Sequence, residues 1–382
     1  MSFARKARTA GIGAVAVAAA ALLAAPAATA APSRPDVVRE SAPVFVQSDN
    51  LTANTVVAYH RDEDGVLSQS AVYPTGGRGG KLYGSVVDHL ASQGSLAYDR
   101  SHGLVYAVNA GSNSVTVFAV HGDRLERLQV IGSGGRFPVS IGVHGDLVYV
   151  LNALNGGSIQ GFVRQGDQLV RVPGWNRELH LDPMATPQFT HTPGQVDFTP
   201  DGSKLVVTTK DAANTIDVFA VGRDGAAAQR PVVTQTPGAV PFGFVFDRAG
   251  RLQVTEAGPN AVATFVVNRD GTLTPVGSAA TGQAATCWVV RTDGRLYASN
   301  AGSASLSGFR VGRGGALTAL GNTTTHAGTV DAAASSDQRN VYVQTGAAGI
   351  VDEFRVNRDG SLTSIGSVTV PGAVGGEGIV AG

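Results

Sequence analysis

Short apolar runs separated by polar turns fill this chain from about residue 42 onward. The clearest example is the segment 105–120, VYAVNAGSNSVTVFAV, in which two apolar runs flank the polar stretch from Asn109 to Ser114. Alternation with a period of two residues is typical of β-strands, and Asn, Gly and Ser tolerate the positive φ angles of tight turns. The pattern therefore predicts a β-hairpin at 105–120.

The same pattern returns until seven copies are present. In each copy an aromatic residue closes the third strand, and a turn of the Asp-Gly type usually follows; these residues are Tyr59, Phe118, Phe162, Phe219, Phe265, Phe309 and Phe354. Their spacing of 44 to 59 residues leaves room for about four short strands per copy, as in one blade of a β-propeller. A β-sandwich also has short strands and many turns, but it would not repeat one aromatic residue and one turn seven times. The sequence predicts an all-β, seven-bladed β-propeller with four-stranded antiparallel blades.

The two ends of the predicted propeller complement each other. The approximate blade ranges are 42–71, 95–130, 138–172, 194–234, 242–276, 285–320 and 330–368. The first blade has no strand before Val44, whereas residues 378–381 supply a strand with nothing left to pair it. We expect the C-terminal strand to enter the first blade and close the ring, because closure removes exposed sheet edges.

We expect the chain to divide into a secretory signal peptide (1–30), a flexible N-terminal arm (31–41) and a single propeller domain (42–382). The signal combines a basic start, an apolar run and a small-x-small cleavage sequence, so we expect a secreted chain with no membrane segment after cleavage, the alternative being an uncleaved anchor. Removing the signal takes away three of the 29 basic residues and leaves a slightly negative chain, which offers no footprint for nucleic acid. A monomer is the default expectation.

Two connections between blades, 73–93 and 173–193, are longer than the others by about a dozen residues. Strands alternate in direction within a blade, so these connections and the loop after each second strand lie on one face, around the mouth of the central channel. Long loops on a rigid scaffold often carry binding residues, although they can also merely cover the rim. This face is the candidate site.

One position in the loop after the second strand is usually Asn, as at Asn109 and Asn300, where a neutral amide can cap its own loop. In two adjacent blades the position holds Lys210 and Glu256 instead. Opposite charges at neighbouring positions indicate either a salt bridge between the blades or an acid and base pair at the channel mouth.

Further candidates lie along the same rim. Gln195 begins the fourth blade, and Cys287 and Trp288 begin the sixth. The lone Cys287 excludes an internal disulfide and is expected to be buried and inert, the alternative being a reactive thiol. Trp288 can form a wall for a ring-shaped ligand or pack in the core. His180 and His191 lack the spacing of metal ligands, so no metal and no cofactor are predicted.

The chain resembles the seven-bladed β-propeller lactonase family, which includes 6-phosphogluconolactonase and carboxymuconate cyclase. The resemblance extends over 42–382 and rests on the 105–120 hairpin, FTPDGSKLVVTTKDAANTIDVFAV at 198–221, VTEAGPNAVATFVVNRDGTLTPVG at 254–277 and ASNAGSASLSGFRV at 298–311. It is strongest for an exported branch of undefined function in which VTEAG and TCWV recur. Enzymes of the family carry Pro-Arg-His entering one inner strand and Asn-Glu after the next strand. This chain has Pro193-Gly194-Gln195 and Lys210-Asp211 at those places.

The resemblance implies a secreted propeller that hydrolyses a non-phosphorylated lactone, or a similar sugar-like molecule, at the channel mouth. Glu256 or Asp211 would be the general base, and Lys210 or Gln195 would hold the carbonyl oxygen. The residues expected to bind the substrate are Gln195, Trp288, His191, Asn109 and Asn300. The alternative is a non-catalytic binding propeller that presents the same rim to a small ligand, a glycan or a protein.

Overall fold

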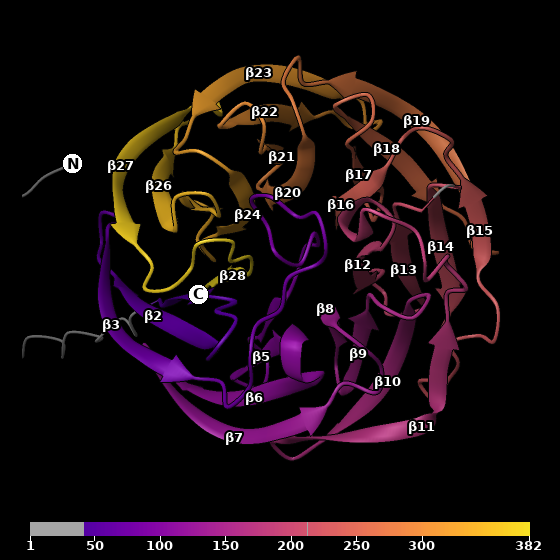
Figure 1. Cartoon of the computed structure of the whole chain (residues 1–382). Helices are drawn as coiled ribbons and strands as arrows, with labels where there is room; N and C mark the ends of the chain where they lie inside the picture. The colour runs from indigo at the N-terminus through magenta and orange to yellow at the C-terminus, as the bar shows by residue number, and fades with distance from the viewer. Residues whose placement is uncertain (1–41, 212) are drawn as a thin grey trace, which may run out of the picture. The chain divides into compact units, whose positions relative to one another are not determined.

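The computed structural model describes residues 42–211 and 213–382. Within these residues, strands β1 to β28 form seven four-stranded sheets arranged in a ring (Figure 1). Two short 3-10 helices, η1 (Ala110–Ser112) and η2 (Gln188–Thr190), lie in loops. The predicted seven-bladed β-propeller is confirmed. The expected signal peptide (1–30) and arm (31–41) lie outside the described residues.

The blades follow the chain in order, and the strands of each blade are named from the channel outward. The first three blades contain β28 (Ile379–Ala381), β1 (Val44–Gln47), β2 (Thr55–Arg61) and β3 (Leu67–Pro74); β4 (Leu96–Asp99), β5 (Leu104–Asn109), β6 (Ser114–His121) and β7 (Arg124–Gly132); and β8 (Pro138–His144), β9 (Leu147–Asn152), β10 (Ser158–Gln165) and β11 (Gln168–Glu178). The fourth and fifth contain β12 (Pro193–Phe198), β13 (Lys204–Thr209), β14 (Thr215–Ala220) and β15 (Val232–Gln235); and β16 (Pro241–Phe246), β17 (Leu252–Glu256), β18 (Ala261–Val267) and β19 (Leu273–Ala280). The last two contain β20 (Thr286–Thr292), β21 (Arg295–Asn300), β22 (Ser305–Val311) and β23 (Leu317–Thr324); and β24 (Thr329–Ala334), β25 (Asn340–Thr345), β26 (Ile350–Val356) and β27 (Leu362–Thr369).

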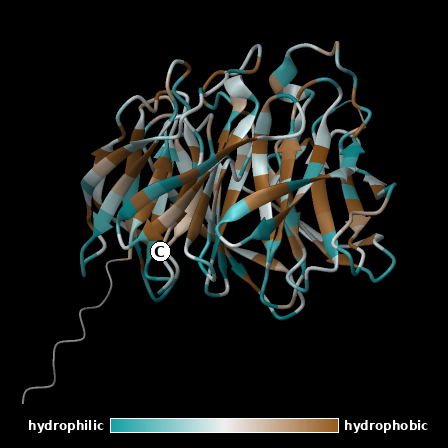
Figure 2. Cartoon of the chain, turned by 90° about the horizontal axis from the view of Figure 1, so that it is seen from below, coloured by the Kyte–Doolittle hydropathy of each residue, from teal (hydrophilic) through white to brown (hydrophobic). Residues whose placement is uncertain are grey.

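The place of a strand in its blade determines how it is buried. Central strands such as β5 and β9 are covered on both faces by the neighbouring blades, and most of their residues are fully buried. Outer strands such as β3 and β19 expose most of their residues. Figure 2 shows the result: hydrophobic segments run through the strands, while many of the turns at the lower edge are hydrophilic. The core therefore lies between blades, which explains why one four-stranded unit needs its neighbours.

The repeated turn after the third strand anchors one blade to the next. In three blades a buried tyrosine hydroxyl donates a hydrogen bond to the carbonyl of a turn glycine in the following blade: Tyr149 to Gly225, Tyr297 to Gly360 and Tyr342 to Gly65. These glycines have φ angles of +90°, +95° and +93°, which side chains rarely adopt. The turn and the tyrosine therefore recur together because each pair joins two sheets.

Ring closure follows the prediction. Strand β28 pairs with β1 in antiparallel register, with Val44 opposite Ala381 and Val46 opposite Ile379. Strand β1, which has no strand before it in the sequence of its own blade, is thus paired on its inner side by β28. The ring therefore has no open sheet edge at this point.

The first long connection enters the mouth of the channel. We call residues 75–95, between β3 and β4, the channel loop. The side-chain amide of Gln93 accepts a hydrogen bond from the N–H of Val289 in β20 at 2.9 Å and donates one to the carbonyl of Val289 at 3.0 Å, as the backbone of a neighbouring strand would. The Gln93 N–H donates to the carbonyl of Gly194 in β12 at 3.0 Å. The loop therefore links the second blade to the fourth and the sixth, and it crosses the centre of the ring in Figure 1.

The other segments of this face hold the channel loop from outside. We call residues 179–192, between β11 and β12, the rim loop. Its Gln188 side chain accepts a hydrogen bond from the N–H of Tyr83 at 2.9 Å. On the other side, the N–H of His89 donates to the carbonyl of Gly375, in the segment before β28, at 2.9 Å. The two long connections therefore share one face, as expected. Among the described residues, no helix is long and apolar enough to cross a bilayer.

Candidate functional site

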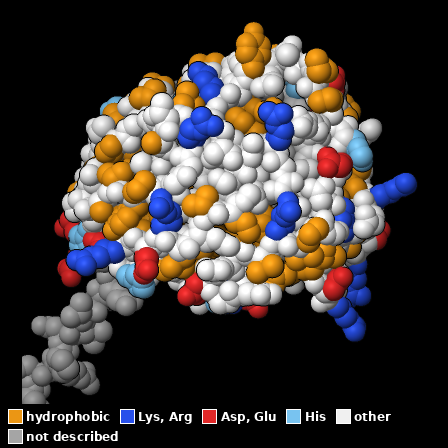
Figure 3. Space-filling view, turned by 60° about the horizontal axis from the view of Figure 1, so that its bottom comes forward, with side chains coloured by type: hydrophobic (Ala, Val, Ile, Leu, Met, Phe, Trp, Pro, Cys, Tyr) orange, Lys and Arg blue, Asp and Glu red, His pale blue; other side chains and the backbone are white. Residues whose placement is uncertain are grey.

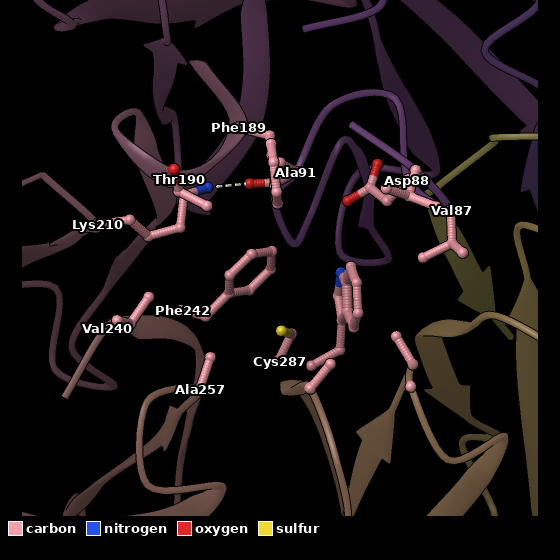
Figure 4. A pocket seen from close by; sticks show the side chains of 15 residues that line it. Val87, Asp88, Ala91, Phe189, Thr190, Lys210, Val240, Phe242, Ala257 and Cys287 are labelled. Atoms are coloured by element: carbon pink, nitrogen blue, oxygen red, sulfur yellow. Dashed lines mark hydrogen bonds between the residues drawn. The ribbon is translucent and has the colours of Figure 1, made fainter. Parts of the chain in front are cut away.

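A pocket of about 370 Å³ opens beside the channel loop, on the face predicted to hold the site (Figure 4). The channel loop forms one side, η2 and the end of β13 form the second, and the inner ends of β16 and β20 form the third. Most lining residues are apolar: Val86, Val87, Ala91, Phe189, Val240, Phe242, Ala257, Ala285, Trp288 and Ala301. Lys210, Asp88 and Cys287 are the lining residues with ionisable side chains.

Lys210 follows β13 and is buried, yet its ammonium group has defined partners. The Nζ atom donates to the carbonyls of Ala91 and Pro193, and it lies 4.5 Å from the centre of the Phe242 ring. Burial lowers the pKa of Lys210 to about 8, against the opposing effect of the Asp88 carboxylate. The side chain is therefore a cation at neutral pH, close to the point where it loses its proton.

Asp88 in the channel loop is the carboxylate of the pocket. It accepts hydrogen bonds from the N–H groups of Leu90 and Ser92, at 2.7 and 3.0 Å. Burial raises the pKa of Asp88 to about 6, although these hydrogen bonds and Lys210 act in the opposite direction. Figure 4 shows Asp88 and Lys210 on opposite sides of the pocket, with Ala91 between them. The arrangement offers one cation and one carboxylate to a molecule bound between them.

Trp288 and Cys287 form the floor on the β20 side. The Trp288 ring packs edge-on against Phe242 with 4.9 Å between ring centres, and its Nε1 donates to the carbonyl of Ser92 at 2.6 Å. Trp288 therefore both lines the pocket and holds the channel loop, which joins the two roles considered for it. Burial raises the pKa of the Cys287 thiol to about 12, so the thiol stays protonated at neutral pH and is a poor nucleophile.

The expected pair of Lys210 and Glu256 is wrong as a salt bridge. Among the ion pairs of the described residues, none joins these two side chains, because Lys210 turns to the channel loop instead. Glu256 lies at the end of β17, outside the pocket lining, and burial raises its pKa. Asp211 also lies outside the lining, where its carboxylate accepts a hydrogen bond from the N–H of Asp182 at 3.4 Å. The structure thus brings only Lys210 of the three catalytic candidates to the pocket.

The remaining binding candidates make hydrogen bonds within the fold. The buried Asn109 amide bonds the hydroxyls of Ser114 and Thr116, and Asn300 bonds those of Ser305 and Ser307 in the same way. The side-chain Oε1 of Gln195 accepts a hydrogen bond from the N–H of Phe244 at 2.7 Å, which links β12 to β16, and the ring Nδ1 of His191 bonds the carbonyl of Pro187. Their positions therefore fit loop capping and blade packing, and none of the four lines the pocket.

Sequence reasoning missed Asp88 and a group of buried carboxyl groups behind it. Glu377 accepts the N–H of Gly94 at 3.0 Å, and its own N–H donates to Asp49 at 3.0 Å. Burial and the nearby Asp331, Asp88 and Asp49 raise the pKa of Glu377 well above its usual range. These residues come from four distant segments. The only sequence signal was Glu377 itself, an acidic residue inside the otherwise apolar, Gly-rich stretch 371–382. No group of His, Cys, Asp and Glu among the described residues has the geometry of a metal site.

Comparison with known proteins agrees with this fold. Residues 253–376 match the family model described as lactonase, 7-bladed beta-propeller. The resemblance to the lactonase propellers is confirmed. The periplasmic gluconolactonase PpgL of Pseudomonas aeruginosa is 17% identical, with a TM-score of 0.67 over 89% of this chain and 98% of that one. A candidate 6-phosphogluconolactonase of Bacteroides fragilis is 18% identical, with a TM-score of 0.70 over 91% of this chain and 100% of that one.

A protein from Lactobacillus plantarum gives the same picture, with 18% identity and a TM-score of 0.70 over 89% of this chain and 99% of that one. At these identities the likeness shows the fold alone. None of the curated proteins compared with the sequence matches it. The seven-bladed propeller fold is therefore established, with a family match over residues 253–376, and the chemistry has to be argued from the pocket.

Proposed function

We propose that this lactonase-type propeller hydrolyses a non-phosphorylated lactone in the pocket between Lys210 and Asp88. The observation that carries the proposal is a buried cation and a buried carboxylate on opposite sides of an otherwise apolar pocket. Ester hydrolysis needs a donor for the developing oxyanion and a base for the attacking water. The two side chains supply these roles at neutral pH.

The chemistry follows from the protonation states. The Asp88 carboxylate takes a proton from water as the water oxygen attacks the lactone carbonyl carbon. An ammonium group has three N–H donors, and two of those on Lys210 bind the carbonyls of Ala91 and Pro193. The third stabilises the carbonyl oxygen as it gains charge. The ring C–O bond then breaks, the leaving oxygen takes the proton that Asp88 removed from the water, and an open hydroxy acid results while Asp88 returns to its ionised form.

The lining favours a substrate without a phosphate group. Lys210 is the only lining residue whose side chain is a cation at neutral pH, and its ammonium group already donates to two backbone carbonyls. A phosphate brings about two negative charges and several strong acceptor oxygens, which proteins usually meet with arginines or a row of N–H groups. The export signal expected at residues 1–30 supports a substrate met outside the cell.

The contacts of Lys210 also favour a second function, non-catalytic binding. Because its ammonium group holds the carbonyl of Ala91, the side chain fastens the channel loop to the fourth blade. A propeller that used Lys210 only for this purpose would keep the pocket and bind a small ligand without turning it over. This alternative predicts saturable binding and no hydrolysis.

A pH-indicator assay on the purified protein, against sugar, homoserine and alkyl lactones, tests the proposal. Turnover that falls by about 10²-fold or more in Asp88→Asn supports the base. Glu256→Gln and Asp211→Asn are matched controls, since both carboxylates lie outside the pocket lining and should leave the rate unchanged. A rate that depends on Glu256 and not on Asp88 would show that hydrolysis takes place outside this pocket. Melting temperatures of all variants exclude loss through unfolding.

A further inference from the structure

The most exposed large hydrophobic residues of the described chain gather on one face. Met184, Val86, Tyr83 and Val374 are 82%, 78%, 70% and 64% exposed, more than any other large hydrophobic residue described. Val86 and Tyr83 belong to the channel loop, Met184 to the rim loop, and Val374 to the segment before β28. We call these four residues the apolar rim. Hydrophobic side chains project from the upper edge of the molecule in Figure 3, where the loops of this face lie.

The three segments of the apolar rim are held together. The N–H of Tyr83 donates to the side chain of Gln188, and the N–H of His89 donates to the carbonyl of Gly375. Gly84 packs so closely on Pro187 that an added Cβ would lie 2.6 Å from its ring. The channel loop is therefore held against both the rim loop and the segment before β28, so the segments that carry the four exposed side chains are in contact with one another through it.

The apolar rim is continuous with the pocket through Val86. This residue lines the pocket and is also one of the two most exposed hydrophobic residues. Exposed apolar surface does not add to the stability of the folded state. Where it adjoins an apolar pocket, it typically marks a place that a ligand covers. The surface that would contact a ligand thus begins between Trp288 and Phe242 and ends in solvent at the rim.

The polar groups of the pocket are few and already have partners. Thr190 Oγ1 donates to the carbonyl of Pro187 at 3.1 Å, Asp88 accepts two backbone N–H groups, and Lys210 donates to two carbonyls. A sugar lactone would bring several hydroxyl groups into this lining and leave most of them without a partner, which is unfavourable. A hydrocarbon substituent would meet only favourable surface.

We propose that the substrate is a lactone with an unbranched hydrocarbon substituent. This inference rests on the proposed function and names the substrate class of the same pocket. The ring ester lies between Lys210 and Asp88, and the chain leaves the pocket past Val86 and covers the apolar rim beside Tyr83. Affinity therefore rises with chain length until the chain extends beyond the rim. At the usual transfer free energy of a methylene group, each CH₂ that becomes buried strengthens binding about four-fold.

Binding of γ-butyrolactone, γ-octalactone and γ-decalactone, measured by calorimetry on the full protein below the aggregation concentration of each lactone, tests the inference. We expect the dissociation constant to fall by at least about ten-fold from the four-carbon to the eight-carbon lactone. Val86→Ser should remove most of this gain. Val233→Ser is the matched control, because Val233 is 51% exposed on the outer strand β15, away from the pocket.

The outcomes separate this inference from the proposed function. Chain-length-dependent binding without hydrolysis would support a substrate with a hydrocarbon substituent and contradict the proposed hydrolytic activity. Hydrolysis of glucono-δ-lactone at least as fast as that of γ-decalactone, with no dependence on chain length, would support the proposed hydrolytic activity. It would overturn the inference that the substrate carries a hydrocarbon substituent. Binding of phosphatidylcholine vesicles, lost in Val86→Ser and combined with no preference among the soluble lactones, would assign the apolar rim to a membrane surface and likewise overturn it.

Discussion

Asp49 offers the sharpest test of the electrostatics, because the structure indicates that replacing it with asparagine stabilises the protein. The carboxyl group is fully buried, and burial raises its pKa to about 8. It accepts the Nε2 of Gln47 at 2.5 Å and the N–H of Glu377 at 3.0 Å. In Asp49→Asn, Oδ1 keeps the bond from Glu377. The new Nδ2 can donate a hydrogen bond to Gln47 Oε1 once the side-chain amide of Gln47 flips, since that oxygen has no partner in the described structure.

The size of the effect follows from the pKa. The folded state binds the Asp49 proton up to about pH 8, whereas an unfolded chain releases it near 3.8. Stability is therefore lost as pH rises from about 4 to about 8, at about 1.4 kcal/mol per pH unit. Asparagine does not ionise, so the variant should gain nothing at pH 4 and up to about 4 kcal/mol at pH 7. The backbone does not oppose the change, because Asp49 has a φ of +51°, a conformation that both aspartate and asparagine tolerate.

Urea unfolding of the parent and of Asp49→Asn at several pH values between 4 and 8 measures this difference directly. We expect the gain to grow with pH. Asp201→Asn is the control of opposite sign: a hydrogen bond from the Thr199 hydroxyl, at 2.6 Å, lowers the pKa of Asp201 to about 2. Its carboxylate therefore contributes stability above about pH 4, which the variant loses. A gain for Asp49→Asn that is equal at pH 4 and pH 8 would refute the reasoning.

Three further predictions concern the pocket and the ring. Because Asp88 must be ionised and Lys210 protonated, the hydrolysis rate should rise through about pH 6 and fall above about pH 8; a rate that still climbs at pH 9 would exclude Lys210 as the oxyanion donor. Gly346→Ala places a Cβ 1.8 Å from the carbonyl of Val87, so it should displace the channel loop, cost about 1–3 kcal/mol of stability by urea unfolding and reduce lactone binding. Deletion of residues 378–382 removes β28 and its pairing with β1, and should lower stability by about 3 kcal/mol or more and promote aggregation, whereas unchanged unfolding would show that ring closure contributes little.

The sequence was sufficient for the architecture because the architecture repeats. The aromatic residue at Phe118 or Phe309 and the turn after it recur for a physical reason, since each blade packs on its neighbour in the same way. Ring closure was also predictable, because a blade without an inner strand and a spare strand at 378–381 can satisfy each other. The caps at Asn109 and Asn300 likewise follow from local chemistry, as both amides bond hydroxyls a few residues away.

The site was less predictable because it depends on a segment without periodicity. Nothing in the sequence shows that the channel loop enters the mouth of the channel, so the contact of Lys210 with Ala91 could not be foreseen. The same applies to Asp88, which no pattern singled out. Glu256 was a reasonable partner for Lys210 by position in adjacent blades, yet equivalent positions need not point toward each other. The direction of a side chain at a loop end is set by whatever packs on it, and here that is the channel loop.

Hydrolysis of γ-decalactone by the parent, Asp88→Asn and Glu256→Gln at pH 7 tests the proposed mechanism most directly. We expect turnover in the parent, a loss of about 10²-fold or more in Asp88→Asn with the melting temperature retained, and an unchanged rate in Glu256→Gln. Equal rates in the parent and in Asp88→Asn, or no turnover by a folded parent that binds the lactone, would contradict the mechanism.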